Sequence, residues 1–114
     1  MKKLIIHIFH THENALITGA KLSERIQQVA GGRGVALEIF IFGPAIAALV
    51  DPAQAGYHDA LVALAKSGVP VIVCRQTIED MGKADLLQAQ GFTLEYARDA
   101  FIRFAQDGAT VISL

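Results

Sequence analysis

Cysteine and charge are both scarce in this chain, and each scarcity argues against a class of protein. Cys74 is the only cysteine, so no internal disulfide can form and nothing marks an oxidising compartment. Only 18% of the 114 residues are charged, the formal net charge is −1, and no block of like charges occurs. We therefore expect no nucleic-acid partner and no binding to a membrane surface, because both need a basic face.

Long apolar runs are also missing. No stretch approaches the roughly 20 residues with which a helix spans a bilayer, so we expect no membrane segment. The start of the chain, 1–9, imitates a signal peptide, but its apolar run is short, His7 interrupts it, and no small-residue cleavage site precedes Glu13. We interpret this start as a first strand, and the cytoplasm is the simplest location.

Apolar residues, by contrast, are abundant and make up 53% of the chain. They suffice for the core of one compact domain, and we expect a single domain over residues 1–114, without repeats or linkers. With so many apolar residues, the remaining polar residues are too few to cover the whole surface of a small monomeric domain. This excess predicts self-association.

Apolar segments of strand length alternate with segments of helical periodicity. Strands are predicted at 3–9, 35–42, 69–74, 91–95 and 109–114, and helices at 15–30, 45–50, 54–66, 76–81, 85–90 and 96–106. This alternation predicts a three-layer α/β/α fold with a five-stranded, mainly parallel sheet. On the last helix we expect Arg98, Asp99 and Arg103 to lie outside or at an edge.

Cys74 ends the third predicted strand, at the edge of the sheet where the carboxyl ends of parallel strands meet and ligands bind. Only a thiolate is a good nucleophile, and free N–H groups at a helix start favour a thiolate. Cys74 is thus a candidate nucleophile, supported by Arg75, Gln76 and Thr77, and Gly43 at the end of the second strand is a further candidate. The alternative is a small buried residue, since cysteine is often buried.

Histidines gather at the end of the first predicted strand. His7 lies within it and is expected to be a buried or interface residue. His10 and His12 follow it and could act as a base or hydrogen-bond donor beside Cys74. Together with Cys74 or His58 they could in principle ligate zinc, but their spacing matches no structural zinc pattern. Because of this spacing we predict no metal site. The glycine-rich stretch 30–34 precedes a strand, which argues against a dinucleotide-binding loop, and we predict no cofactor.

Several segments together resemble the DsrE/DsrF-like proteins, a family of small parallel α/β domains that includes sulfur-relay subunits and stand-alone members. The segments are FGPAIAAL (42–49), SGVPVIVCRQTIEDMG (67–82), GFTLEY (91–96) and GATVISL (108–114). The most specific part is the spacing of Gly68, Cys74 and Gly82. Thr77 looks like the threonine that several stand-alone members carry three residues after the cysteine.

The resemblance implies that Cys74 accepts sulfur as a persulfide and passes it to a partner thiol, as the matching cysteine does in the relay members. It also implies a homo-oligomer, most often a trimer or hexamer with a dimer as the alternative, and a protein partner that donates or accepts sulfur. Two other hypotheses stay open: a non-catalytic small-ligand-binding module and a structural subunit of an oligomer. Whether the chain is itself a sulfurtransferase-type enzyme is left open as well.

Overall fold

The computed structural model describes residues 1–114, in which helices and strands alternate as the sequence predicts. The elements are β1 (Lys2–Ile8), α1 (Ala15–Ala30), η1 (Gly31–Arg33), β2 (Val35–Ile41), α2 (Pro44–Leu49), η2 (Pro52–Gln54), α3 (Ala55–Lys66), β3 (Val71–Cys74), α4 (Arg75–Asp80), α5 (Ala84–Ala89), β4 (Thr93–Glu95), α6 (Ala97–Gln106) and β5 (Thr110–Ser113). Every predicted strand and helix is present within two residues at each end. The two short 3-10 turns, η1 and η2, are additions to the prediction.

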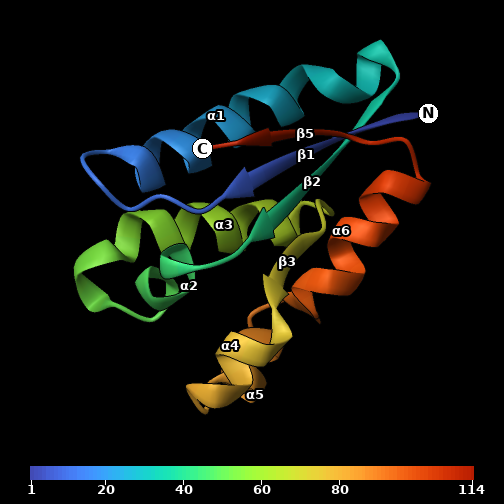
Figure 1. Cartoon of the computed structure of the whole chain (residues 1–114). Coiled ribbons are helices and arrows are strands. Elements are labelled where there is room, and N and C mark those ends of the chain that lie inside the picture. Colours follow the sequence, from blue (N-terminus) through green and yellow to red (C-terminus); the bar gives the residue numbers. More distant parts are fainter.

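The five strands form one sheet in the order β4-β3-β2-β1-β5, of which Figure 1 labels β3, β2, β1 and β5. All four neighbouring pairs are parallel, which confirms the predicted fold class. The strand order, which the sequence pattern does not give, places β2 between β1 and β3. The loop that follows β1 therefore starts one strand away from the end of β3.

One face of the sheet, which we call the aliphatic face, lies under α1 and α3. A Cβ added to Gly19 of α1 would lie 3.5 Å from the Ile8 side chain. Ile8 is paired with Ile41, and neighbours in register share a face because side chains alternate along each strand. By this register the face comprises Leu4, Ile6, Ile8, Leu37, Ile39, Ile41, Val71 and Val73.

The opposite face, which we call the α6 face, lies under a single helix of ten residues. The Phe104 ring of α6 lies 5.8 Å from the Phe40 ring of β2, measured between centroids. By the same register this face comprises His7, Phe9, Glu38, Phe40, Phe42, Ile72, Cys74 and Glu95. The sheet thus has helices on both sides, and its second face mixes aromatic, charged and thiol side chains.

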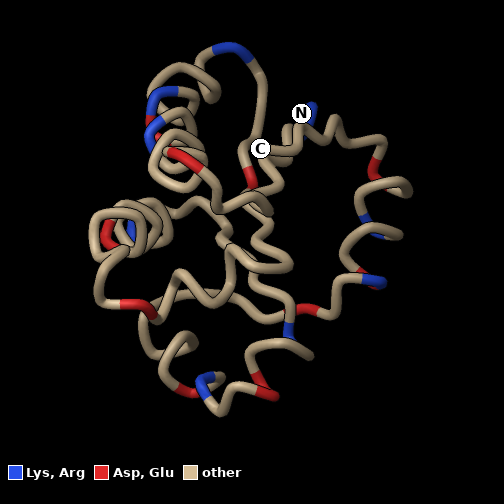
Figure 2. Tube along the Cα trace, turned by 60° about the vertical axis from the view of Figure 1, so that its left-hand side comes forward, with Lys and Arg blue, Asp and Glu red and all other residues tan.

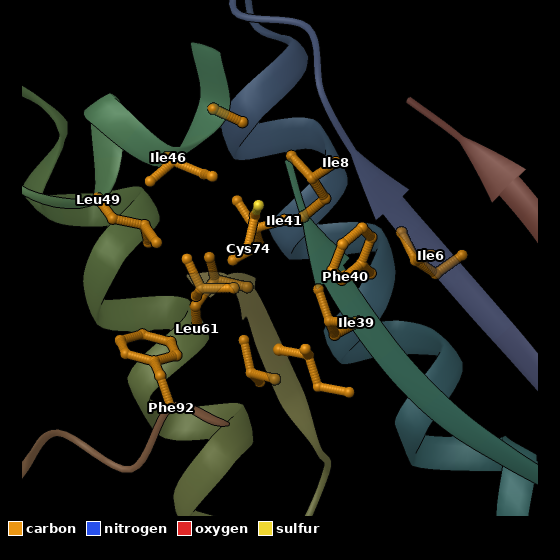
Figure 3. Packing of buried hydrophobic residues seen from close by; sticks show 14 of the residues in the cluster. Ile6, Ile8, Ile39, Phe40, Ile41, Ile46, Leu49, Leu61, Cys74 and Phe92 are labelled. Atoms are coloured by element: carbon orange, nitrogen blue, oxygen red, sulfur yellow. The ribbon is translucent and has the colours of Figure 1, made fainter. Parts of the chain in front are cut away.

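A single hydrophobic core holds the layers together. It consists of one cluster of 27 buried residues from both faces of the sheet and the helices that cover them. Figure 3 shows part of it, with Ile41, Ile46 and Leu61 packed around the carboxyl half of β2 and β3. The continuity of this cluster makes the chain one compact α/β domain.

Charged residues are scattered along the whole trace. Figure 2 shows both signs spread over the helices without a large region of one sign. No helix of the chain combines the length and the apolar character that crossing a bilayer demands.

Candidate functional site

Cys74 ends β3, whose four residues are all buried, and directly precedes α4. Its side chain belongs to the core cluster (Figure 3). Only 4% of the residue is exposed. The Thr77 hydroxyl Oγ1, one turn into α4, donates a hydrogen bond to Cys74 Sγ at 3.8 Å. The thiol is therefore held at the end of the strand, with a hydrogen-bond donor beside it.

A pocket of about 430 Å³ opens above this thiol, and we call it the Cys74 pocket. Its lining residues are Phe42, Cys74, Gln76, Thr77, Tyr96, Ala97 and Arg98. They come from the segments that follow or end the adjacent strands β2, β3 and β4. The pocket thus lies at the carboxyl edge of the sheet, where parallel α/β folds place their ligands.

Arg98 is the only charged residue that lines the Cys74 pocket. Its guanidinium carbon lies 5.3 Å from the centroid of the Tyr96 ring, within the range of a cation–π contact. Arg98 Nε also lies 3.5 Å from Asp99 Oδ1, and 79% of the Arg98 side chain is exposed. The rim of the pocket therefore carries one positive group that two neighbours orient.

The supporting residues predicted after Cys74 divide into two groups. Gln76 and Thr77 line the pocket with the thiol. Arg75 does not line it, because its guanidinium donates to the Leu94 carbonyl at 3.4 Å and lies 3.9 Å from Glu79 Oε1. Arg75 thus ties α4 to β4.

Gly43 shapes the same edge without lining the pocket. Its backbone has φ 67° and ψ −143°, a region that residues with a side chain avoid. A Cβ at this position would lie 2.4 Å from the Phe9 ring. Phe9 in turn packs beside Phe42, with ring centroids 6.0 Å apart. Gly43 therefore allows Phe9 to support a wall residue of the pocket.

The predicted histidine pair lies apart from the pocket lining. The rings of His10 and His12 are exposed and 5.3 Å apart. No group of three or more His, Cys, Asp or Glu side chains in the chain is arranged to hold a metal ion. His58 is engaged elsewhere, through Asp59 at 3.0 Å and Gln90 at 2.9 Å.

His7 sits on the α6 face among aromatic rings. Its Nδ1 lies 3.0 Å from the Ser113 hydroxyl on β5, and its Nε2 is buried without a hydrogen-bond partner. The rings of Phe40 and Phe101 lie 5.8 Å and 5.5 Å away. Burial lowers the pKa of His7, and the charge of His10 acts in the same direction. His7 therefore stabilises the fold in its neutral form.

A charged cluster that the sequence prediction missed fastens α6 to the sheet. Arg103 donates to both carboxylate oxygens of buried Glu38, at 3.2 and 2.9 Å, and to both of Glu95, at 3.2 and 2.8 Å. Hydrogen bonds to Glu95 and Glu38 raise the pKa of Arg103. Arg103 thus lies between helix and sheet, further inward than expected. Glu38, the only charge in an otherwise apolar strand, was the signal for it.

Among the comparisons with known proteins, only the one with solved structures finds matches. No protein-family model matches the chain, and no curated protein matches it. Similar structures include BT1422 from Bacteroides thetaiotaomicron (16% identity, TM-score 0.73, 96% of this chain and 94% of that one) and the ychN protein of Escherichia coli (18%, 0.70, all of both chains). A third is MTH1491 from Methanobacterium thermoautotrophicum (15%, 0.72, all of both chains).

BT1422 and MTH1491 are described as proteins of unknown function. At these identities the likeness shows a shared fold and nothing of activity. The chain is therefore an α/β domain whose whole architecture recurs in bacterial and archaeal proteins.

Proposed function

We propose that this chain is a DsrE/DsrF-like protein that carries sulfur as a persulfide on Cys74. The observation that carries the proposal is the position of this thiol in a pocket at the carboxyl edge of the sheet. The spacing of Gly68, Cys74 and Gly82, together with the fold shared with the three solved structures, supports the family assignment.

The chemistry is an exchange between two thiols. The Cys74 thiolate attacks the outer sulfur of a donor persulfide, R–S–SH. The new bond joins Cys74 Sγ to that sulfur, the donor S–S bond breaks, and R–S⁻ leaves with the bonding electrons. An acceptor thiolate then attacks the outer sulfur of the Cys74 persulfide and releases the Cys74 thiolate. No net oxidation occurs, so neither step needs a cofactor.

Thr77 has a role in this scheme as a hydrogen-bond donor. Its hydroxyl already donates to Cys74 Sγ at 3.8 Å, and a donor that faces an anionic sulfur binds it more strongly than a neutral thiol. Since Cys74 is the only cysteine, a persulfide on it cannot be resolved within the chain. The proposal therefore includes a separate donor and a separate acceptor, in the cytoplasm, where thiols stay reduced.

Mass spectrometry of the intact chain after incubation with a sulfane-sulfur donor tests the proposal. The expected result is a gain of one sulfur atom on the wild type, reversed by a reducing thiol and absent from Cys74→Ser. A wild type that gains no sulfur, or a Cys74→Ser chain that gains as much, would contradict sulfur carriage.

The low exposure of Cys74, 4%, favours a second candidate function, a small-ligand-binding module in which the thiol merely lines the pocket. Alkylation of the folded chain with iodoacetamide separates the two. Sulfur carriage predicts that Cys74 is alkylated under native conditions as readily as a small free thiol. The binding module predicts slow alkylation in the folded chain that becomes fast only in denaturant.

We also propose that the chain forms a homo-oligomer, a trimer or hexamer with a dimer as the alternative. Large apolar side chains are exposed on α6 and on the edge strand β5: Phe101, Ile102, Val111 and Ile112. Because β5 leaves one side of its backbone unpaired, a second copy could cover both the strand and these side chains. Sedimentation equilibrium checks this: the wild type is expected to associate and Ile102→Asp to weaken the association, whereas a monomeric wild type would contradict it.

A further inference from the structure

We propose that the Cys74 pocket selects small anionic sulfane-sulfur compounds and that Arg98 is the residue that selects them. This inference rests on sulfur carriage by Cys74 and names the chemical class of its donor. Its basis is the arrangement of a recessed thiol, a pocket of limited size and a single cation on the rim.

The depth of the thiol favours a small donor over a protein. Only 4% of Cys74 is exposed, so a donor sulfur must enter the pocket to reach Sγ. The pocket volume of about 430 Å³ lies within the range of small-molecule sites, about 300 to 1,000 Å³. A persulfide of low molecular mass fits inside such a space as a whole. A cysteine on the surface of a folded partner would have to bring its own main chain in with it.

The charge of the pocket favours an anion. Arg98 is the only charged lining residue, whereas neighbouring cations are engaged: Arg75 with Glu79 and Arg103 with Glu38 and Glu95. The contact of Arg98 with Asp99 that brings the two side chains to 3.5 Å is made by Nε, and 79% of the Arg98 side chain is exposed, so the terminal amino groups of the guanidinium are accessible to a ligand. These groups form the planar fork that suits a carboxylate.

Arg98 is placed where it can bind the part of the donor that does not react with Cys74. Arg98 lies on the rim, stacked near Tyr96, while Cys74 and Thr77 lie deeper on another segment of the lining. A donor can thus place its persulfide at Cys74 while its carboxylate meets Arg98. After transfer, the leaving thiolate R–S⁻ keeps that carboxylate and departs with it.

The rate of sulfur uptake by Cys74 from two donors of opposite charge tests the inference. The probes are glutathione persulfide, whose non-reacting part carries carboxylates, and cysteamine persulfide, whose non-reacting part carries only an ammonium group. For Arg98→Gln we expect uptake from glutathione persulfide to slow about tenfold, the size of one charged hydrogen-bond contact, and uptake from cysteamine persulfide to stay the same or rise. Arg98→Lys is expected to restore part of the rate. Arg25→Gln, at an exposed position on α1, is the matched control and should match the wild type.

Equal uptake from both donors, or equal slowing of both in Arg98→Gln, would overturn the inference and leave sulfur carriage standing. A binding measurement tests anion selection independently of sulfur transfer. S-methylglutathione cannot transfer sulfur, and its binding to Cys74→Ser, followed by NMR, should weaken about tenfold when Arg98→Gln is added. Absence of binding to Cys74→Ser, or binding unchanged by Arg98→Gln, would overturn anion selection whether or not Cys74 carries sulfur.

Discussion

The aliphatic face and the α6 face belong to the same sheet but are covered to different extents. α1 and α3, with 16 and 12 residues, lie over the aliphatic face, and α6, with ten, lies over the other. The two long helices over the aliphatic face leave space only for the packing of apolar side chains. Partial cover leaves the carboxyl ends of β2, β3 and β4 open to a pocket, and the thiol, the charged cluster and His7 all lie on that side. The Cys74 pocket thus lies where the helical layer is incomplete.

The largest expected effect is on the aliphatic face. Ile39 is fully buried there, so Ile39→Ala removes buried methyl groups and leaves a cavity, at a cost of about 4 kcal/mol in the free energy of unfolding. Urea denaturation measures this loss. Val29→Ala, at an exposed position on α1, is the control and should change stability by less than about 0.5 kcal/mol. A similar loss in both variants would mean that this face is not the packed one.

At the pocket edge of the α6 face, Gly43→Ala is expected to cost about 3 kcal/mol. The substitution combines a strained positive φ with a clash against the Phe9 ring. Thermal unfolding gives the measurement. Gly31→Ala is the matched control, because Gly31 has helical φ and no atom within 4 Å of an added Cβ, and it should be neutral or slightly stabilising. Equal stability of the two variants would contradict the geometry at Gly43.

Removal of the cation in the charged cluster should have a smaller effect. Arg103→Met leaves the buried Glu38 carboxylate without its partner, but Arg103 is partly open to water, so we expect a loss of about 2 kcal/mol. The double variant Arg103→Met/Glu38→Gln should recover part of that loss, since no unpaired charge remains. Urea denaturation of the single and double variants checks this. A double variant that is less stable than Arg103→Met, by as much as the loss of the Glu38 charge costs by itself, would show that the two side chains are not coupled.

The smallest expected effect is a change in pH dependence from His7. Its folded-state pKa is lowered, so the unfolded chain binds a proton more readily, and its contribution to stability declines as pH falls through the unfolded value of about 6.5. His7→Phe should therefore flatten the loss of stability between pH 7.5 and pH 5.5. Urea midpoints at these two pH values provide the measurement. An unchanged slope would assign the loss to other groups.

The sequence predicts the aliphatic face better than the α6 face. Periodicity located α1 at both ends, because a long amphipathic helix leaves a repeated signal in sequence. Strand order leaves no such signal, so the distance from His10 and His12 to Cys74 could not be foreseen. Arg98 was also missed as a lining residue. It reaches the pocket only because β4 pairs with β3, a contact between residues about 20 positions apart.

The part of the pocket lining that could be placed from sequence depends on local spacing. Gln76 and Thr77 follow Cys74 within one helical turn, so their position beside the thiol follows from the start of α4 alone. Arg75 belongs to the same turn, but its long side chain extends to the Leu94 carbonyl on the neighbouring strand. Short side chains near a strand end can thus be placed from sequence, whereas long charged ones depend on the tertiary neighbours that they reach.

The contact between Gly43 and Phe9 has a consequence for the divergence of this fold. The ring of Phe9 occupies the space that a side chain at position 43 would need. Positions 9 and 43 should therefore change together over evolutionary time. Chains with this architecture that keep a large aromatic residue at the first position should hold glycine at the second, and a bulkier residue at the second should accompany a small one at the first. In an alignment of homologous chains, the packing of these two loops would appear as a correlated pair of substitutions.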